Sequence, residues 1–201
     1  MANWVTVFID ELKHTSLLEW LGAGFGAAEV LLAKANKVWL YPAGILSVGI
    51  TIYLFQQSGL YAETVLNGYY LIMSIYGWWF WVHKRAVHPL PVTRSDSRDK
   101  KITMAIAVGG FVFLYFALKY CTNSVVPVMD AFVSATAWAG MWLLAKRKLE
   151  NWIWLNISNA VAIPLLFYKQ LPVYALLTLF LFAVAVVGFF DWRKIVVEND
   201  Q

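Results

Sequence analysis

The segments EVLLAKANKVW (residues 29–39) and MWLLAKRKLENW (residues 141–152) share the tetrapeptide LLAK, each time followed by a tryptophan. The sequence downstream matches as well. A Tyr-Ala pair follows both tryptophans at the same distance, and a glycine precedes a tryptophan by four in both IYGWWFW (75–81) and VVGFFDW (186–192). The three spacings between the first and second copies differ by only one or two residues, as short insertions would produce. We therefore expect the chain to contain a duplication.

The composition indicates that the chain lies in lipid. Of its 201 residues, 61% are hydrophobic, 17% are aromatic and only 14% are charged, and the mean hydropathy is +0.61. Soluble domains carry about 25% charged residues. The net charge of +4 sits in short segments between apolar runs, which favours membrane topology over nucleic-acid binding. The single cysteine, Cys121, excludes an intrachain disulfide.

Seven apolar segments are each long enough to cross a membrane. They are continuous rather than alternating, which favours helices over a barrel. Their approximate ranges are 16–33, 38–57, 61–82, 102–120, 126–145, 150–168 and 171–192. The polar segment 83–101 is the one substantial loop, and it separates the chain into two parts. The sequence thus predicts an all-α membrane protein with seven transmembrane helices.

The basic residues predict the orientation of these helices. Thirteen of the sixteen Lys and Arg residues follow the first, third, fifth and seventh segments, and three (Lys13, Lys119 and Lys169) lie elsewhere. By the positive-inside rule, the segment 1–15 is extracytoplasmic, while the loop 83–101 and the tail 193–201 are cytoplasmic. The N-terminus lacks a basic region and does not resemble a cleaved signal.

The duplication predicts a 3+1+3 arrangement. Three helices reverse the side of the membrane, so a second triple in the same orientation requires one additional crossing. We expect a first repeat at 16–82, a linker helix at 102–120 and a second repeat at 126–192. Parallel repeats of this kind occur in transporters that bind substrate between the two halves, near the midplane.

Polar side chains inside the membrane are costly and are candidates for a binding site. In the sixth segment, Asn156 and Asn159 share a helix face, and Trp152 lies two turns before Asn159. A flat indole and amide groups suit a heteroaromatic ring with polar substituents. The alternative, weighed equally from position alone, is that these side chains only hold helices together.

The third segment carries a second polar group, formed by Glu63, Asn67 and Tyr70. Together with Asp130 and Glu19, Glu63 would make the outer mouth acidic and attractive to cations. The alternative is that these are ordinary residues at headgroup level. Two further features complete the candidate set: Pro42 and Pro164 lie inside expected helices as possible hinges, and the three histidines form no metal-binding pattern.

The blocks LYAETVLNGYYLIMSIYGWWFW (60–81) and LLAKRKLENW (143–152), together with Asn159, resemble the PnuC family of vitamin transporters. The resemblance implies a seven-helix 3+1+3 fold like that of the SWEET sugar transporters, and a homotrimer in the bacterial inner membrane. It implies facilitated diffusion of an unphosphorylated vitamin precursor, usually nicotinamide riboside, which a cytoplasmic kinase then traps. Thiamine is a close alternative and riboflavin a more distant one. Neither catalysis nor a bound cofactor is implied.

The ligand motif of that family is W-x-x-W-x-x-x-N/D. Trp152 and Asn159 match it, whereas Leu155 stands at the second tryptophan, and Asn67 stands where relatives commonly have glutamine. Two other classes fit less well. A membrane enzyme would need clustered catalytic groups near one interface, and a retinal photoreceptor would need a lysine inside the last helix, where none occurs.

Overall fold

The computed structural model of the chain describes residues 8–9, 12–58, 60–85, 91–122 and 124–199, with the backbone alone for 61–63, 65–66 and 84–85. Seven long helices follow one another in this described part, and residues 8–9 and 12–14 are also helical. The long helices are α2 (Leu17–Lys34), α3 (Leu40–Gln57), α4 (Tyr61–Arg85), α5 (Ser97–Cys121), α6 (Pro127–Ala145), α7 (Asn151–Tyr168) and α8 (Pro172–Asn199). The expected all-helical fold is confirmed. The expected first segment, 1–15, falls partly outside the described residues.

Local sequence explains where two of these helices begin. Ser16 accepts a hydrogen bond from the Glu19 N–H at 3.2 Å, and the Glu19 carboxylate accepts from the Ser16 N–H at 2.6 Å. Asp96 and Asp99 form the same capping box before α5. The backbone hydrogen bond from Asp99 lowers the pKa of Asp96. Because this cap starts α5 ahead of its apolar part, the helix begins at Ser97 rather than at the expected 102.

The ends of α2, α6 and α7 share one turn geometry. Asn36, Arg147 and Gln170 follow α2, α6 and α7 with φ angles of 54°, 55° and 60°. A residue in this left-handed conformation ends a helix and lets its last carbonyls accept backbone hydrogen bonds. Lys37 N–H donates to the Leu32 carbonyl at 2.9 Å in this way. The turns reverse the chain within a few residues and place consecutive helices side by side.

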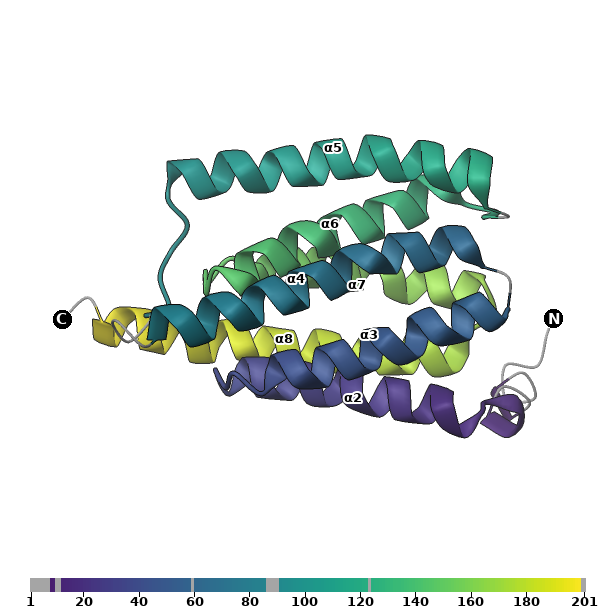
Figure 1. Cartoon of the computed structure of the whole chain (residues 1–201), viewed down its shortest axis with the longest axis horizontal. Coiled ribbons are helices and arrows are strands. Elements are labelled where there is room, and N and C mark those ends of the chain that lie inside the picture. The colour runs from purple at the N-terminus through teal and green to yellow at the C-terminus, as the bar shows by residue number, and fades with distance from the viewer. Residues whose placement is uncertain (1–7, 10–11, 59, 86–90, 123, 200–201) are drawn as a thin grey trace.

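Six of the helices form a closed ring in the order α2, α3, α4, α6, α7, α8. Consecutive members pack together, and α8 packs against α2. In the described residues α3 and α7 do not approach each other, so they lie on opposite sides of the ring. The remaining helix, α5, packs mainly on α6 and runs along the top of Figure 1. We call the end with Gln57 and Cys121 the outer end, and the end with Lys34 and Lys146 the inner end.

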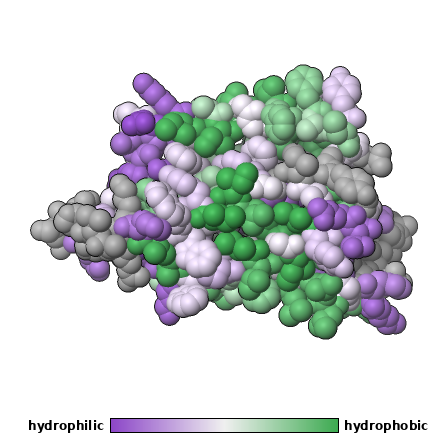
Figure 2. All heavy atoms as spheres, in the orientation of Figure 1, coloured by the Kyte–Doolittle hydropathy of each residue, from purple (hydrophilic) through white to green (hydrophobic). Residues whose placement is uncertain are grey.

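Three of the described helices, α5, α6 and α8, are long and apolar enough to cross a membrane by length and composition. Figure 2 shows apolar side chains over the middle of one face and polar side chains gathered toward its two ends. Exposed apolar residues such as Phe113 (57%) and Val108 (57%) lie on α5. Crossing of the membrane by the other four helices stays a prediction.

Several contacts recur at one constant spacing along the chain. The Ser47 hydroxyl donates to the Gly22 carbonyl at 2.8 Å, and the Ser158 hydroxyl donates to the Val133 carbonyl at 2.7 Å. These contacts join α2 to α3 and α6 to α7 in the same way. We call the spacing that separates Gly22 from Val133, and equally Ser47 from Ser158, the repeat spacing. The two LLAK tetrapeptides are separated by one residue more, so they are one residue out of register with the contacts.

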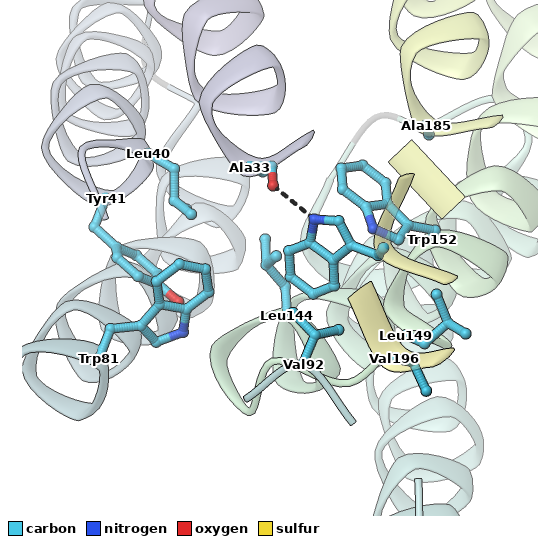
Figure 3. Packing of buried hydrophobic residues seen from close by; sticks show 11 residues of the cluster. Ala33, Leu40, Tyr41, Trp81, Val92, Leu144, Leu149, Trp152, Ala185 and Val196 are labelled. Carbon is cyan, nitrogen blue, oxygen red and sulfur yellow. Dashed lines mark hydrogen bonds between the residues drawn. The ribbon is translucent and has the colours of Figure 1, made fainter. Parts of the chain in front are cut away.

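At the inner end, two tryptophans join the neighbouring helices α4 and α6, and α8 and α2, in the same way. The Trp81 indole of α4 donates to the Ala145 carbonyl of α6 at 3.1 Å, and the Trp192 indole of α8 donates to the Ala33 carbonyl of α2 at 3.1 Å. Figure 3 shows Ala33 as the acceptor between the groups that contain Trp81 and Trp152. Trp81 and Trp192 are 2% and 0% exposed, so these hydrogen bonds are shielded from solvent.

Glycines admit two aromatic rings beside these tryptophans. A Cβ at Gly188 would lie 2.8 Å from the Trp152 ring, and a Cβ at Gly77 would collide with the Tyr41 ring. At the repeat spacing, Trp152 is thus the counterpart of Tyr41. The comparison of the two LLAK segments suggests Trp39 instead. Trp39 itself is 67% exposed.

Candidate functional site

A cavity of about 400 Å³ opens at the outer end of the bundle. Its walls come from the outer parts of α3, α4, α5, α6 and α7. They are formed by Phe55, Leu60, Asn67, Tyr70, Leu118, Ser124, Asp130, Ser134, Trp138 and Lys169. The cavity combines one indole, one phenol, an amide, two hydroxyls and one acid–base pair, so its lining offers both aromatic surface and polar groups.

The α4 side of the cavity carries two of the expected site residues. Asn67 and Tyr70 lie one turn apart and are both half-buried. Between them, Tyr69 stacks on Trp138 with ring centroids 4.3 Å apart and an interplanar angle of 21°. The Tyr69 hydroxyl also donates to the Trp138 carbonyl at 3.1 Å. This double contact fixes the indole that forms the wall of the cavity between α4 and α6.

An ion pair between α6 and the residue that follows α7 also lines the cavity. The Lys169 ammonium lies 2.6 and 2.8 Å from the two carboxylate oxygens of Asp130, and the Ser124 hydroxyl donates to the same carboxylate at 2.6 Å. Asp130 stands in the first turn of α6 after Pro127, where the helix dipole favours a negative charge. Lys169 is held by the turn at Gln170 that ends α7.

Trp152 lies elsewhere, in the aromatic core at the inner end. It is fully buried, and its ring meets Trp192 edge to face at a centroid distance of 5.6 Å. Figure 3 shows Trp152 within this packed group. Its indole nitrogen is buried and has no hydrogen-bond partner among the described residues. The structure therefore does not bring Trp152 into the outer cavity with Asn67 and Tyr70.

A sequence model described as "Nicotinamide mononucleotide transporter" matches residues 16–194 of the chain. The chain belongs to this family. It is similar to proteins described as "Nicotinamide riboside transporter PnuC" from Escherichia coli (strain K12) and from Shigella flexneri. Each of these is 23% identical over an alignment of 175 residues, and the match covers 74% of this chain and 73% of the relative. The resemblance to the PnuC family is confirmed.

The fold also matches a solved structure, "Crystal structure of the Vitamin B3 transporter PnuC", with a TM-score of 0.72. The two are 20% identical, and the match covers 97% of this chain and 88% of the other. The family member described here is therefore a multi-pass membrane protein from a family of transporters, with the helical fold of that structure.

Two further expected site residues, Asn156 and Asn159, lie on α7. The Asn156 side-chain oxygen is buried on α7 without a partner among the described residues, and Asn159 is half-buried. Neither lines the outer cavity. Glu63 belongs to the first turn of α4, but its side chain lies outside the described part of the structure.

The two expected hinge residues occupy different positions in their helices. Pro42 lies in the first turn of α3, where a missing N–H costs little, whereas Pro164 lies inside α7. They are not equivalent at the repeat spacing, and the hinge role stays a prediction.

Sequence reasoning missed part of the cavity wall. Ser124, Ser134, Trp138 and Lys169 were not proposed as site residues, although all four line the cavity. Lys169 did carry a signal, because it is one of only three basic residues on the expected outer side. Its partner Asp130 had been noted for its outer position, and a pairing of the two was the missing step.

Proposed function

We propose that this transporter carries out facilitated uptake of nicotinamide riboside, an unphosphorylated vitamin precursor, which is trapped inside the cell by phosphorylation. The observation that carries the proposal is the family match over 16–194, together with relatives described as nicotinamide riboside transporters. The outer cavity supports it, because Trp138 contributes an aromatic wall and Asn67 and Tyr70 offer polar groups for a sugar or a carboxamide.

Thiamine is the second candidate. It is flat and cationic like nicotinamide riboside, so the aromatic and acidic groups of the outer cavity suit both. One observation favours keeping it: Leu155, which replaces the second tryptophan of the family motif, fills space against Gly140, where a Cβ would lie 2.8 Å from its side chain. A site with leucine at this position differs from that of relatives that carry nicotinamide riboside.

We also propose the 3+1+3 architecture for this chain, with α2–α4 and α6–α8 as parallel repeats and α5 as the linker. The contacts that recur at the repeat spacing and the closed ring support it. The excess of basic residues at the inner end supports a cytoplasmic location for that end and for the tail 193–201. The resemblance to the family supports a homotrimer in the inner membrane.

Within this architecture, the outer cavity is the entry site and the α7 residues are the deeper site. Asn156 supports this, because its buried oxygen lacks a partner among the described residues and a substrate N–H would satisfy it. Asn159 and Trp152 belong to the same proposed site through the family motif. Glu63, from its place at the start of α4, would contribute negative charge at the entrance.

The test is binding and counterflow with purified protein. Nicotinamide riboside, thiamine and riboflavin are titrated separately, and proteoliposomes are loaded with unlabelled compound and given labelled compound outside. We expect one of the first two compounds to bind and exchange, without change when proton and sodium gradients are collapsed. Failure of all three to bind or exchange would overturn the proposal, and loss of exchange with the gradients would overturn facilitated diffusion.

A further inference from the structure

The geometry of the outer cavity points to a competition between two positive charges for the Asp130 carboxylate. One is the Lys169 ammonium, and the other is the charged ring of the substrate. The inference rests on the proposed function, because it assumes that a vitamin with a positively charged ring enters this cavity. It assigns to this pair the selection of cationic over neutral aromatic substrates.

The carboxylate of Asp130 is fully engaged in the described structure. Lys169 contacts both of its oxygens, at 2.6 and 2.8 Å, and Ser124 donates to one of them at 2.6 Å. The Ser124 oxygen in turn accepts from the Val126 N–H at 3.3 Å. Hydroxyl and backbone thus hold the carboxylate in place, while its charge is balanced by a single long and flexible side chain.

The pair is partly withdrawn from water, which makes its balance of charge important. The side chains of Asp130 and Lys169 are only 16% and 26% exposed, and both line the cavity. A carboxylate in such a place needs a positive partner, since losing one partner of a shielded pair leaves an uncompensated charge. Lys169 supplies that partner when the cavity is empty.

A substrate ring with a fixed positive charge can take over this role. Trp138 and Tyr70 line the same cavity, so a ring held against them would lie in the space that Asp130 also borders. Lys169 stands at the end of α7 on a flexible stem and can swing outward to water. Binding of a cation then exchanges one partner of Asp130 for another, whereas a neutral ring leaves the ion pair in place and gains nothing from it.

The experiment compares two substrates that differ in ring charge: nicotinamide riboside, which is cationic, and its reduced form, in which the dihydropyridine ring is neutral. The ratio of their dissociation constants is measured for wild type, Lys169→Met, Asp130→Asn and the double variant. Lys119→Met is the matched control, because Lys119 is a lysine of the outer end that contacts Tyr115 and does not line the cavity.

We expect Lys169→Met to raise the preference for the cationic form at least tenfold, because Asp130 then has no internal partner. Asp130→Asn and the double variant should both lower the preference at least tenfold below wild type, and Lys119→Met should leave it within threefold. The double variant carries no unpaired charge, so it keeps the comparison valid if Lys169→Met folds poorly.

Two results would count against the inference in different ways. The same ratio in all five proteins would show that the ion pair is only a structural contact, and it would overturn the inference while leaving the proposed function intact. Binding of neither compound to wild type would overturn the proposed function and this inference with it.

Discussion

Arg147 donates a hydrogen bond to the side-chain oxygen of Asn36, and the repeat spacing separates these two residues in the chain. Both stand in left-handed turns, with φ angles of 55° and 54°, directly after α6 and α2. Asn36 and Arg147 therefore occupy equivalent positions in the two turns. Two equivalent residues can touch only beside the axis that relates the proposed halves, so this contact marks the axis at the inner end.

Replacing Arg147 by alanine should destabilise the contact between the halves. The guanidinium also lies 4.3 Å from the centre of the Trp81 ring and is largely buried. Loss of a charged hydrogen bond and of a cation–π contact should cost about 2–3 kcal/mol, measured as a lower melting temperature in detergent. The exposed Arg98, at the same end, is the control, and Arg98→Ala should melt within about 1 °C of wild type.

Removing either inner indole hydrogen bond should have a similar but smaller effect. Trp81→Phe removes the indole donor to the Ala145 carbonyl, and Trp192→Phe removes the indole donor shared by the Ala33 and Lys34 carbonyls, so each should cost about 1–2 kcal/mol. Trp39→Phe, at a largely exposed position, provides the control. Equal melting temperatures for all three variants would show that these indole hydrogen bonds do not stabilise the fold.

Adding a methyl group at Gly188 should disturb the aromatic core. The new Cβ would come within 2.8 Å of the Trp152 ring, which is packed against Trp192 and cannot retreat freely. Gly188→Ala should therefore lose about 1–3 kcal/mol of stability. At Gly109 a Cβ would meet nothing within 4 Å, so Gly109→Ala should be neutral or slightly stabilising.

Asn156→Ala separates a binding role from a role in helix packing. The amide oxygen has no partner among the described residues, so its removal should leave the melting temperature unchanged or raise it. If Asn156 binds substrate, the dissociation constant should rise about tenfold. A variant that melts earlier and binds normally would instead show that Asn156 holds helices together.

Cys121 permits a direct test of orientation, because it is the sole cysteine of the chain and is exposed at the outer end of α5. A maleimide that cannot cross membranes should label it in intact cells. The matched protein carries Cys121→Ser and Ser97→Cys, which moves the thiol to the exposed start of α5 at the inner end. This protein should react only after the cells are opened, and the reverse pattern would contradict the proposed topology.

The sequence predicted the helices well because each of them contains a continuous apolar segment, which hydropathy detects. It was least accurate where a helix leaves the apolar region. The polar start of α5 and the end of α8, which extends past Trp192 to Asn199, are helical because caps and backbone hydrogen bonds continue there without an apolar signal.

The sequence predicted the candidate site less completely, and the reason is geometric. Asn67 and Tyr70 share a helix face, which periodicity reveals, but Lys169 and Asp130 are brought together only by the packing of α6 with α7. For Trp152, helix periodicity predicted a place in the site, and packing placed the side chain elsewhere. Its spacing from Asn159 places both on one face, but the space left by Gly188 draws the ring into the core between α7 and α8.

The two inner hydrogen bonds of Trp81 and Trp192 also have a mechanical consequence. They fasten the ring on both sides at the inner end, so a relative rotation of the halves about the line joining these two points would leave both in place and would instead strain the contact of Tyr69 with Trp138 farther out. Displacement in a rotation grows with the lever arm. Along α6, Asp130 lies about 22 Å from Ala145 at 1.5 Å per residue, so a rotation of roughly 10° would carry it about 4 Å. The outer cavity thus lies where the leverage is greatest.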